Sequence, residues 1–165
     1  MGTSFVKYKE HGFWAHDGWL EMVLFVLVRE IDQLDETPKW LEMVRNEWLQ
    51  SASAGYMGCV PTRLDEFAAS DEHRSILSRI AQSALMRVER NLPLPKNDLI
   101  VEHWGGYPLT EPNLPLQKEI DDTSRDLEAF ELFLRTLKMF VLLFEGQIIT
   151  TAGDQEALPH LWVIP

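Results

Sequence analysis

Apolar side chains recur at alternating steps of three and four residues over the stretch 124–145, and this spacing constrains the fold more than any other feature of the chain. The recurring positions are Leu127, Phe130, Leu134, Leu137, Val141 and Phe144. Side chains at this spacing line one face of an α-helix. Thr123-Ser124-Arg125-Asp126 resembles a capping box at the start, and Gly146 follows the end. The spacing predicts a long amphipathic helix that buries one face.

A second helix is predicted near the N-terminus, over about residues 18–34. The stretch Met22–Val28 is an uninterrupted apolar run, so this helix is apolar nearly all round. A helix of that kind is buried on all sides. We therefore expect it at the centre of the fold, with Asp17 as its N-cap.

The middle of the chain carries three more helical signals. The predicted helices span about residues 38–54, 62–69 and 71–90, with Thr37, Thr62 and Ser70 or Asp71 as their respective capping residues. In the first of them, Trp40, Val44 and Trp48 recur every four residues. With the helices above, these segments predict a mostly α fold, a helical bundle of about four to five helices in a single domain covering residues 1–165.

Other segments lack the helical period. Residues 91–117 hold five of the nine prolines, which excludes an ordinary helix and predicts a Pro-rich loop. Near the C-terminus, Ile148–Thr151 and Leu161–Ile164 are short β-prone runs. They predict a small β element, paired with each other or with Val101. The segment Ser4–Trp14 shows no clear helical period either, and no element is assigned to it.

The chain is strongly acidic, with 26 acidic and 15 basic residues and a net charge of −11. An anionic surface repels phosphate backbones and lipid headgroups, so we expect neither nucleic acid nor membrane as a partner. The same field attracts a basic protein partner. A simpler explanation of the charge is that it keeps the domain in solution.

Cysteine usage and the N-terminus point to the cytoplasm. Cys59 is the only cysteine, which excludes an intrachain disulfide and favours a reducing compartment. The first residues show no basic region followed by an apolar run, so no signal peptide is predicted. The apolar run Met22–Val28 is far shorter than the ~20 residues that span a bilayer. We expect Cys59 to be a small buried hydrophobe rather than a nucleophile.

No motif predicts a metal or a cofactor. The chain has no Glu-x-x-His pair and no His-Glu-x-x-His sequence, and one cysteine does not make a structural zinc site. His11, His16 and Asp17 lie close in sequence, and we expect capping and loop roles for them rather than metal ligation. No glycine-rich phosphate loop and no serine hydrolase elbow is present.

The most unusual string lies in the Pro-rich region, where an acid, an imidazole and two aromatic rings surround a glycine pair. Loops of this kind often carry recognition, although Trp104 can equally serve to anchor the loop on the core. Acidic residues also crowd the start of the last helix. The candidate binding residues are Glu102, His103, Trp104, Tyr107, Asp121 and Asp122.

Three functions fit these observations. The first is a non-catalytic acidic protein-binding domain, in its most concrete form an immunity or antitoxin-like inhibitor of a basic protein toxin. The second is an enzyme with a diffuse His and acid site around Glu102 and His103. The third is a structural or oligomerisation module, such as a homodimer. We expect the first, because the sequence holds no catalytic constellation.

Overall fold

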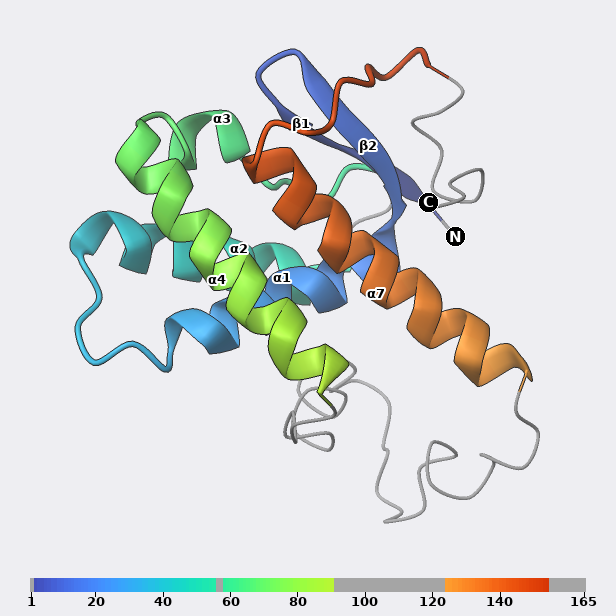
Figure 1. Cartoon of the computed structure of the whole chain (residues 1–165), viewed down its shortest axis with the longest axis horizontal. Coiled ribbons are helices and arrows are strands. Elements are labelled where there is room, and N and C mark those ends of the chain that lie inside the picture. The colour runs from blue at the N-terminus through green and yellow to red at the C-terminus, as the bar shows by residue number, and fades with distance from the viewer. Residues whose placement is uncertain (1, 56–57, 91–123, 155–165) are drawn as a thin grey trace.

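The computed structural model describes residues 2–55, 58–90 and 124–154 (Figure 1). The described elements, in chain order, are β1 (Thr3–Tyr8), β2 (His11–His16), α1 (Asp17–Ile31), α2 (Lys39–Ser53), α3 (Leu64–Phe67), α4 (Asp71–Glu89) and α7 (Ser124–Phe144). Five helices and one two-stranded sheet therefore make up this part of the chain. The expectation of a mostly α fold with about four to five helices is confirmed in this coarse sense.

Helix α1 is the centre of the fold, as its composition predicted. It contacts α2, α4 and α7 and also both strands of the hairpin. Figure 1 shows α4 and α7 side by side across α1, with the hairpin at one end. Leu20, Leu24 and Leu27 are each fully buried in it. Burying a side chain of this size contributes roughly 1.5–3 kcal/mol, so α1 supplies much of the core.

The apolar face of α7 is also confirmed where its side chains are described, over residues 131–144. Leu137, Phe140 and Phe144 are buried, and Phe140 packs edge-on against Phe13 of β2 with ring centroids 5.8 Å apart. Gly146 follows the helix with a left-handed φ of 74°. Glycine adopts this conformation without a steric penalty, which is why the helix ends there.

The structure describes the N-cap of four helices, and in one of them the predicted residue is the cap. The Ser70 hydroxyl accepts a hydrogen bond from the His73 backbone N–H at 3.1 Å, which caps α4. The N-caps of α1 and α2 are instead His16 and Pro38, and neither makes a side-chain capping bond. The N-cap of α3 is Arg63, in a left-handed conformation. The Asp17, Thr37 and Thr62 predictions were therefore wrong.

The small β element lies at the N-terminus and not at the C-terminus, which corrects the prediction. Strands β1 and β2 pair antiparallel, with Phe5 opposite Trp14 and Val6 opposite Phe13. Val6 and Phe13 are buried on the inner face, while Phe5 and Trp14 are half-buried on the outer face. Apolar side chains on both faces hide the alternation that marks a strand in the sequence.

The β-prone run Ile148–Thr151 forms no strand, but it lies along β2. The Gly12 N–H donates to the Thr150 carbonyl at 2.8 Å, and the Thr150 hydroxyl donates to the Gly12 carbonyl at 2.7 Å. The Trp14 indole N–H donates to the Ala152 carbonyl at 3.1 Å. The segment after α7 therefore covers the outer edge of β2.

Several predictions fall outside the described residues. They concern the Pro-rich loop over 91–117, the possible strand at Leu99–Val101 and the run Leu161–Ile164. Within the described residues, no helix combines the length and apolar character that crossing a bilayer requires.

Candidate functional site

The six candidate binding residues lie in the stretch between α4 and α7, outside the residues that the structure describes. They are Glu102, His103, Trp104, Tyr107, Asp121 and Asp122. Their predicted role in recognition stays a prediction. The candidate site below is built from the described acidic residues and the aromatic side chains beside them.

Many of the acidic side chains are neutralised by neighbours within the fold. Glu30 is buried on α1, accepts a hydrogen bond from the Ser83 hydroxyl at 2.7 Å and pairs with Arg87 of α4. Asp32 pairs with Arg45 at 2.9 Å. Carboxylates of this kind stabilise helix packing and present little uncompensated charge to a partner.

Four exposed carboxylates form no ion pair with another described residue. Asp35 and Glu36 lie in the loop before α2, Glu42 lies in its first turn, and Glu72 lies in the first turn of α4. Acidic residues at helix N-termini interact favourably with the helix dipole, which accounts for part of their placement. Their charge nevertheless remains available to a cation from outside.

A ring contact brings the two helix starts together. Trp40 in the first turn of α2 stacks on His73 in the first turn of α4, with centroids 3.8 Å apart and planes inclined by 9°. Both side chains are half-buried, and Met43, one turn further along α2, is 52% exposed. We call these side chains and the four carboxylates the α2/α4 patch, which consists of Asp35, Glu36, Trp40, Glu42, Met43, Glu72 and His73.

The patch has the composition of a protein-binding surface. Tryptophan and methionine are enriched at the centres of protein interfaces, and charged groups are found at their rims. The ring face of tryptophan also attracts the cations of arginine and lysine. A surface that combines aromatic and apolar side chains with exposed carboxylates therefore suits a partner that carries basic side chains.

Electrostatic perturbation among the described residues lies mainly outside this patch. A hydrogen bond from Arg63 lowers the pKa of the Glu66 carboxyl, and Glu66 in turn raises the pKa of Arg63, to which Glu47 also contributes. Hydrogen bonds from the Thr151 backbone and side chain lower the pKa of Asp154. Both carboxyl groups are exposed and form local ion pairs or turns, which are structural features rather than signs of acid–base catalysis.

The predicted group around Asp17 is a structural cluster. The buried Asp17 carboxylate accepts hydrogen bonds from the Ser4 hydroxyl and from the Gly58 N–H, both at 2.6 Å. The Ser4 oxygen accepts from the Val60 N–H at 2.7 Å. Cys59 lies between these two tethered residues and is exposed, so the expected burial of its thiol was wrong. The two flanking amides are held inward, which leaves the side chain between them directed to solvent.

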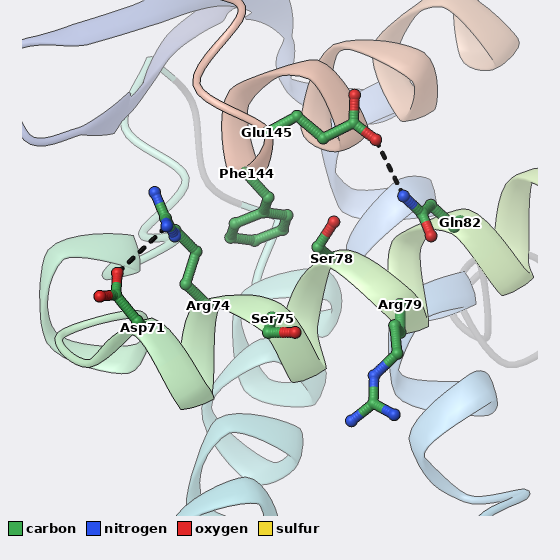
Figure 2. Close-up of a pocket in the computed structure, with 8 residues that line it drawn as sticks. All are labelled: Asp71, Arg74, Ser75, Ser78, Arg79, Gln82, Phe144 and Glu145. Carbon is green, nitrogen blue, oxygen red and sulfur yellow. Dashed lines mark hydrogen bonds and ion pairs between the residues drawn. The ribbon is translucent and has the colours of Figure 1, made fainter.

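No metal centre is found in the described part of the chain, where no three His, Cys, Asp or Glu side chains lie close enough to hold an ion. A pocket of about 370 Å³ lies between α4 and the end of α7, and Figure 2 shows the residues that line it. The Asp71–Arg74 ion pair closes one end, and the hydrogen bond between Gln82 and Glu145 closes the other. Four of its polar side chains bond one another in these two pairs, and Ser75, Ser78 and Arg79 make up the rest of its polar lining.

Comparison with known proteins finds no relative. No protein-family model, curated protein or solved structure matches the chain.

Sequence reasoning missed the α2/α4 patch because the Trp40–His73 contact is not local. Trp40 was predicted to lie on the core face of its helix, and it does pack partly against the core. No role was predicted for His73. Nothing in the local pattern of either helix indicates that their first turns meet.

Proposed function

We propose that the protein is a non-catalytic binding domain whose α2/α4 patch binds a basic protein. The observation that carries the proposal is the Trp40–His73 stack, which joins two helix starts that carry exposed carboxylates without an ion-pair partner among the described residues. The net charge of −11 supports it, because a long-range anionic field accelerates encounter with a basic partner.

The most concrete form of the proposal is an immunity or antitoxin-like inhibitor of a basic toxin. A nuclease-type toxin carries cationic surfaces for its phosphate substrate, and an acidic domain competes for those surfaces. The free thiol of Cys59 suits a reducing compartment such as the cytoplasm, where such an inhibitor acts.

The test is capture of the partner under conditions that separate specific from diffuse charge attraction. The purified protein is immobilised and exposed to extract from its source at low and at physiological salt, and retained proteins are identified by mass spectrometry. A basic protein that elutes as salt rises, and that then binds again in purified form, supports the proposal.

The control is a charge change of equal size elsewhere on the surface. Glu42→Lys and Glu72→Lys reverse charges in the patch, whereas Glu10→Lys reverses an exposed charge in the hairpin turn. We expect the first two variants to retain less of the partner than the parent protein does, and the third to retain as much. Retention by all three, or the absence of any basic partner, would contradict the proposal.

A further inference from the structure

One edge of the hairpin forms backbone hydrogen bonds with another described segment, and the other edge does not. The Gly12 N–H points away from β1, because it donates to Thr150. In an antiparallel pair, residues opposite each other direct their backbone groups the same way, either toward or away from the partner strand. Gly12 lies opposite Lys7, and the register continues with Phe5 and Thr3. The backbone groups of these three β1 residues therefore point away from β2.

These outward groups have no partner in the described chain. No hydrogen bond joins the backbone of Thr3, Phe5 or Lys7 to a described residue outside the hairpin. Thr3 and Lys7 are exposed and Phe5 is half-buried. Unpaired backbone donors and acceptors in a row are a template for another extended chain.

The charge along this edge differs from that of the whole molecule. Lys7 makes no ion pair with another described residue, and the Lys9 ammonium lies 5.3 Å from the Tyr8 ring centroid. Lys7 thus brings a positive charge to this edge, whereas at the turn Lys9 lies beside the exposed Glu10 and its backbone N–H donates to the Asp65 carboxylate. A second copy of β1 would bring another Lys7 to the same place, whereas a carboxylate on an added strand would complement it.

The outer face supplies a further contact for an added strand. Phe5 lies opposite Trp14 with ring centroids 5.2 Å apart, and its ring covers Gly12, where a Cβ would lie 2.9 Å from Phe5 Cζ. The Phe5 ring therefore lies on the outer face of the hairpin, between Thr3 and Lys7 along β1. An apolar side chain opposite Phe5 and a carboxylate opposite Lys7 would match the edge in both shape and charge.

We propose that β1 is a docking edge for an extended, carboxylate-bearing segment of another protein, which adds as a strand beside Thr3, Phe5 and Lys7. The main-chain hydrogen bonds provide affinity, and Phe5 and Lys7 select the sequence. This surface is separate from the α2/α4 patch, and its test does not depend on the identity of a basic partner.

The probe is an acetylated and amidated peptide, Thr-Glu-Thr-Val-Thr-Glu-Thr, which places valine opposite Phe5 and glutamate opposite Lys7. Its matched control is Thr-Lys-Thr-Val-Thr-Lys-Thr. Binding to the full chain is followed by backbone amide NMR and hydrogen exchange. We expect the acidic peptide to slow exchange of the Thr3, Phe5 and Lys7 amides by about fivefold or more, and the basic peptide to have no such effect.

Two variants separate backbone from charge. Lys7→Pro removes the outward donor without touching the ladder to β2, and Lys7→Glu keeps the donor while reversing the charge; both should weaken binding by about threefold to tenfold. Lys39→Glu, at an exposed position on α2, is the matched control and should bind normally. Circular dichroism establishes that each variant is folded.

Four results would overturn the inference. The first is that the acidic and basic peptides bind equally well, or that neither peptide binds. The second is unchanged affinity in both Lys7 variants. The third is protection of these amides before any peptide is added, and the fourth is protection that grows with protein concentration alone, which would assign the edge to a second copy of the chain.

Discussion

The Ser4 hydroxyl donates a hydrogen bond of 2.6 Å to the buried carboxylate of Asp17, which joins the first strand to the start of the central helix. The same oxygen accepts from the Val60 N–H, so one side chain connects three segments that are distant in sequence.

Removal of this hydroxyl should destabilise the fold. Ser4→Ala leaves the Val60 N–H and one Asp17 oxygen without a partner in a buried place, at an expected cost of about 1–3 kcal/mol in the free energy of unfolding. Urea denaturation measures it. Ser53→Ala serves as control, because the exposed Ser53 hydroxyl bonds only the Leu49 carbonyl one turn earlier, and it should change stability little. Equal effects of the two substitutions would show that the cluster is not a structural connection.

The two glycines Gly12 and Gly18 should respond oppositely to alanine. A Cβ at Gly12 would lie 2.1 Å from the Val6 carbonyl oxygen, so Gly12→Ala should destabilise by about 2 kcal/mol or more. A Cβ at Gly18, within α1, meets nothing within 4 Å, so Gly18→Ala should stabilise by a few tenths of a kcal/mol up to ~1 kcal/mol. Thermal unfolding compares the stabilities of the two variants. A destabilised Gly18→Ala variant would contradict the start of α1 at Asp17.

The Trp40–His73 stack should contribute measurably to the contact between α2 and α4. His73→Ala leaves the Ser70 cap intact, since that bond uses the backbone N–H, and should cost about 0.5–1.5 kcal/mol. A double-mutant cycle with Trp40→Leu isolates the ring contact from the packing of Trp40 on the core. A coupling energy near zero would mean that the two rings do not stack in solution.

The pKa of Glu66 should depend on Arg63. Because hydrogen bonding to Arg63 lowers the folded-state pKa of this carboxyl, its contribution to stability is present above the unfolded-state value of about 4.3 and is lost as pH falls through the folded value. Carboxyl-detected NMR should give a depressed pKa in the parent protein and a normal one in Arg63→Gln. A pKa that does not move would show that this exposed pair does not form in solution.

The helices were predictable because their signals are local. A step of three or four residues is read within one segment, and the buried positions Leu24, Leu137 and Phe144 follow from it. Capping was less predictable, since a Ser, Thr, Asp or Asn at the right spacing can form a side-chain cap but does not ensure one. Ser70 caps α4, whereas Thr62 makes no cap, and its carbonyl accepts a hydrogen bond from the Trp48 indole N–H at 2.9 Å.

The hairpin and the candidate site were not predictable for two different reasons. In the hairpin, Phe5 and Trp14 place apolar surface on the outer face, and Lys9 adopts the turn's left-handed φ of 55° where glycine or asparagine is the usual signal. In the α2/α4 patch, the meeting of Trp40 and His73 depends on how two helices pack on α1. Such tertiary contacts leave no periodic mark in a single sequence.

The affinity of the captured basic partner for matched charge variants tests the central proposal most directly. Isothermal titration calorimetry at low and physiological salt compares the parent protein with the Glu42→Lys/Glu72→Lys double variant and with Glu10→Lys. We predict that the double variant binds about tenfold or more weakly, equivalent to ~1.4 kcal/mol, while Glu10→Lys stays within about twofold of the parent. Equal weakening by Glu10→Lys, or no weakening by the double variant, would show that the α2/α4 patch is not the binding surface.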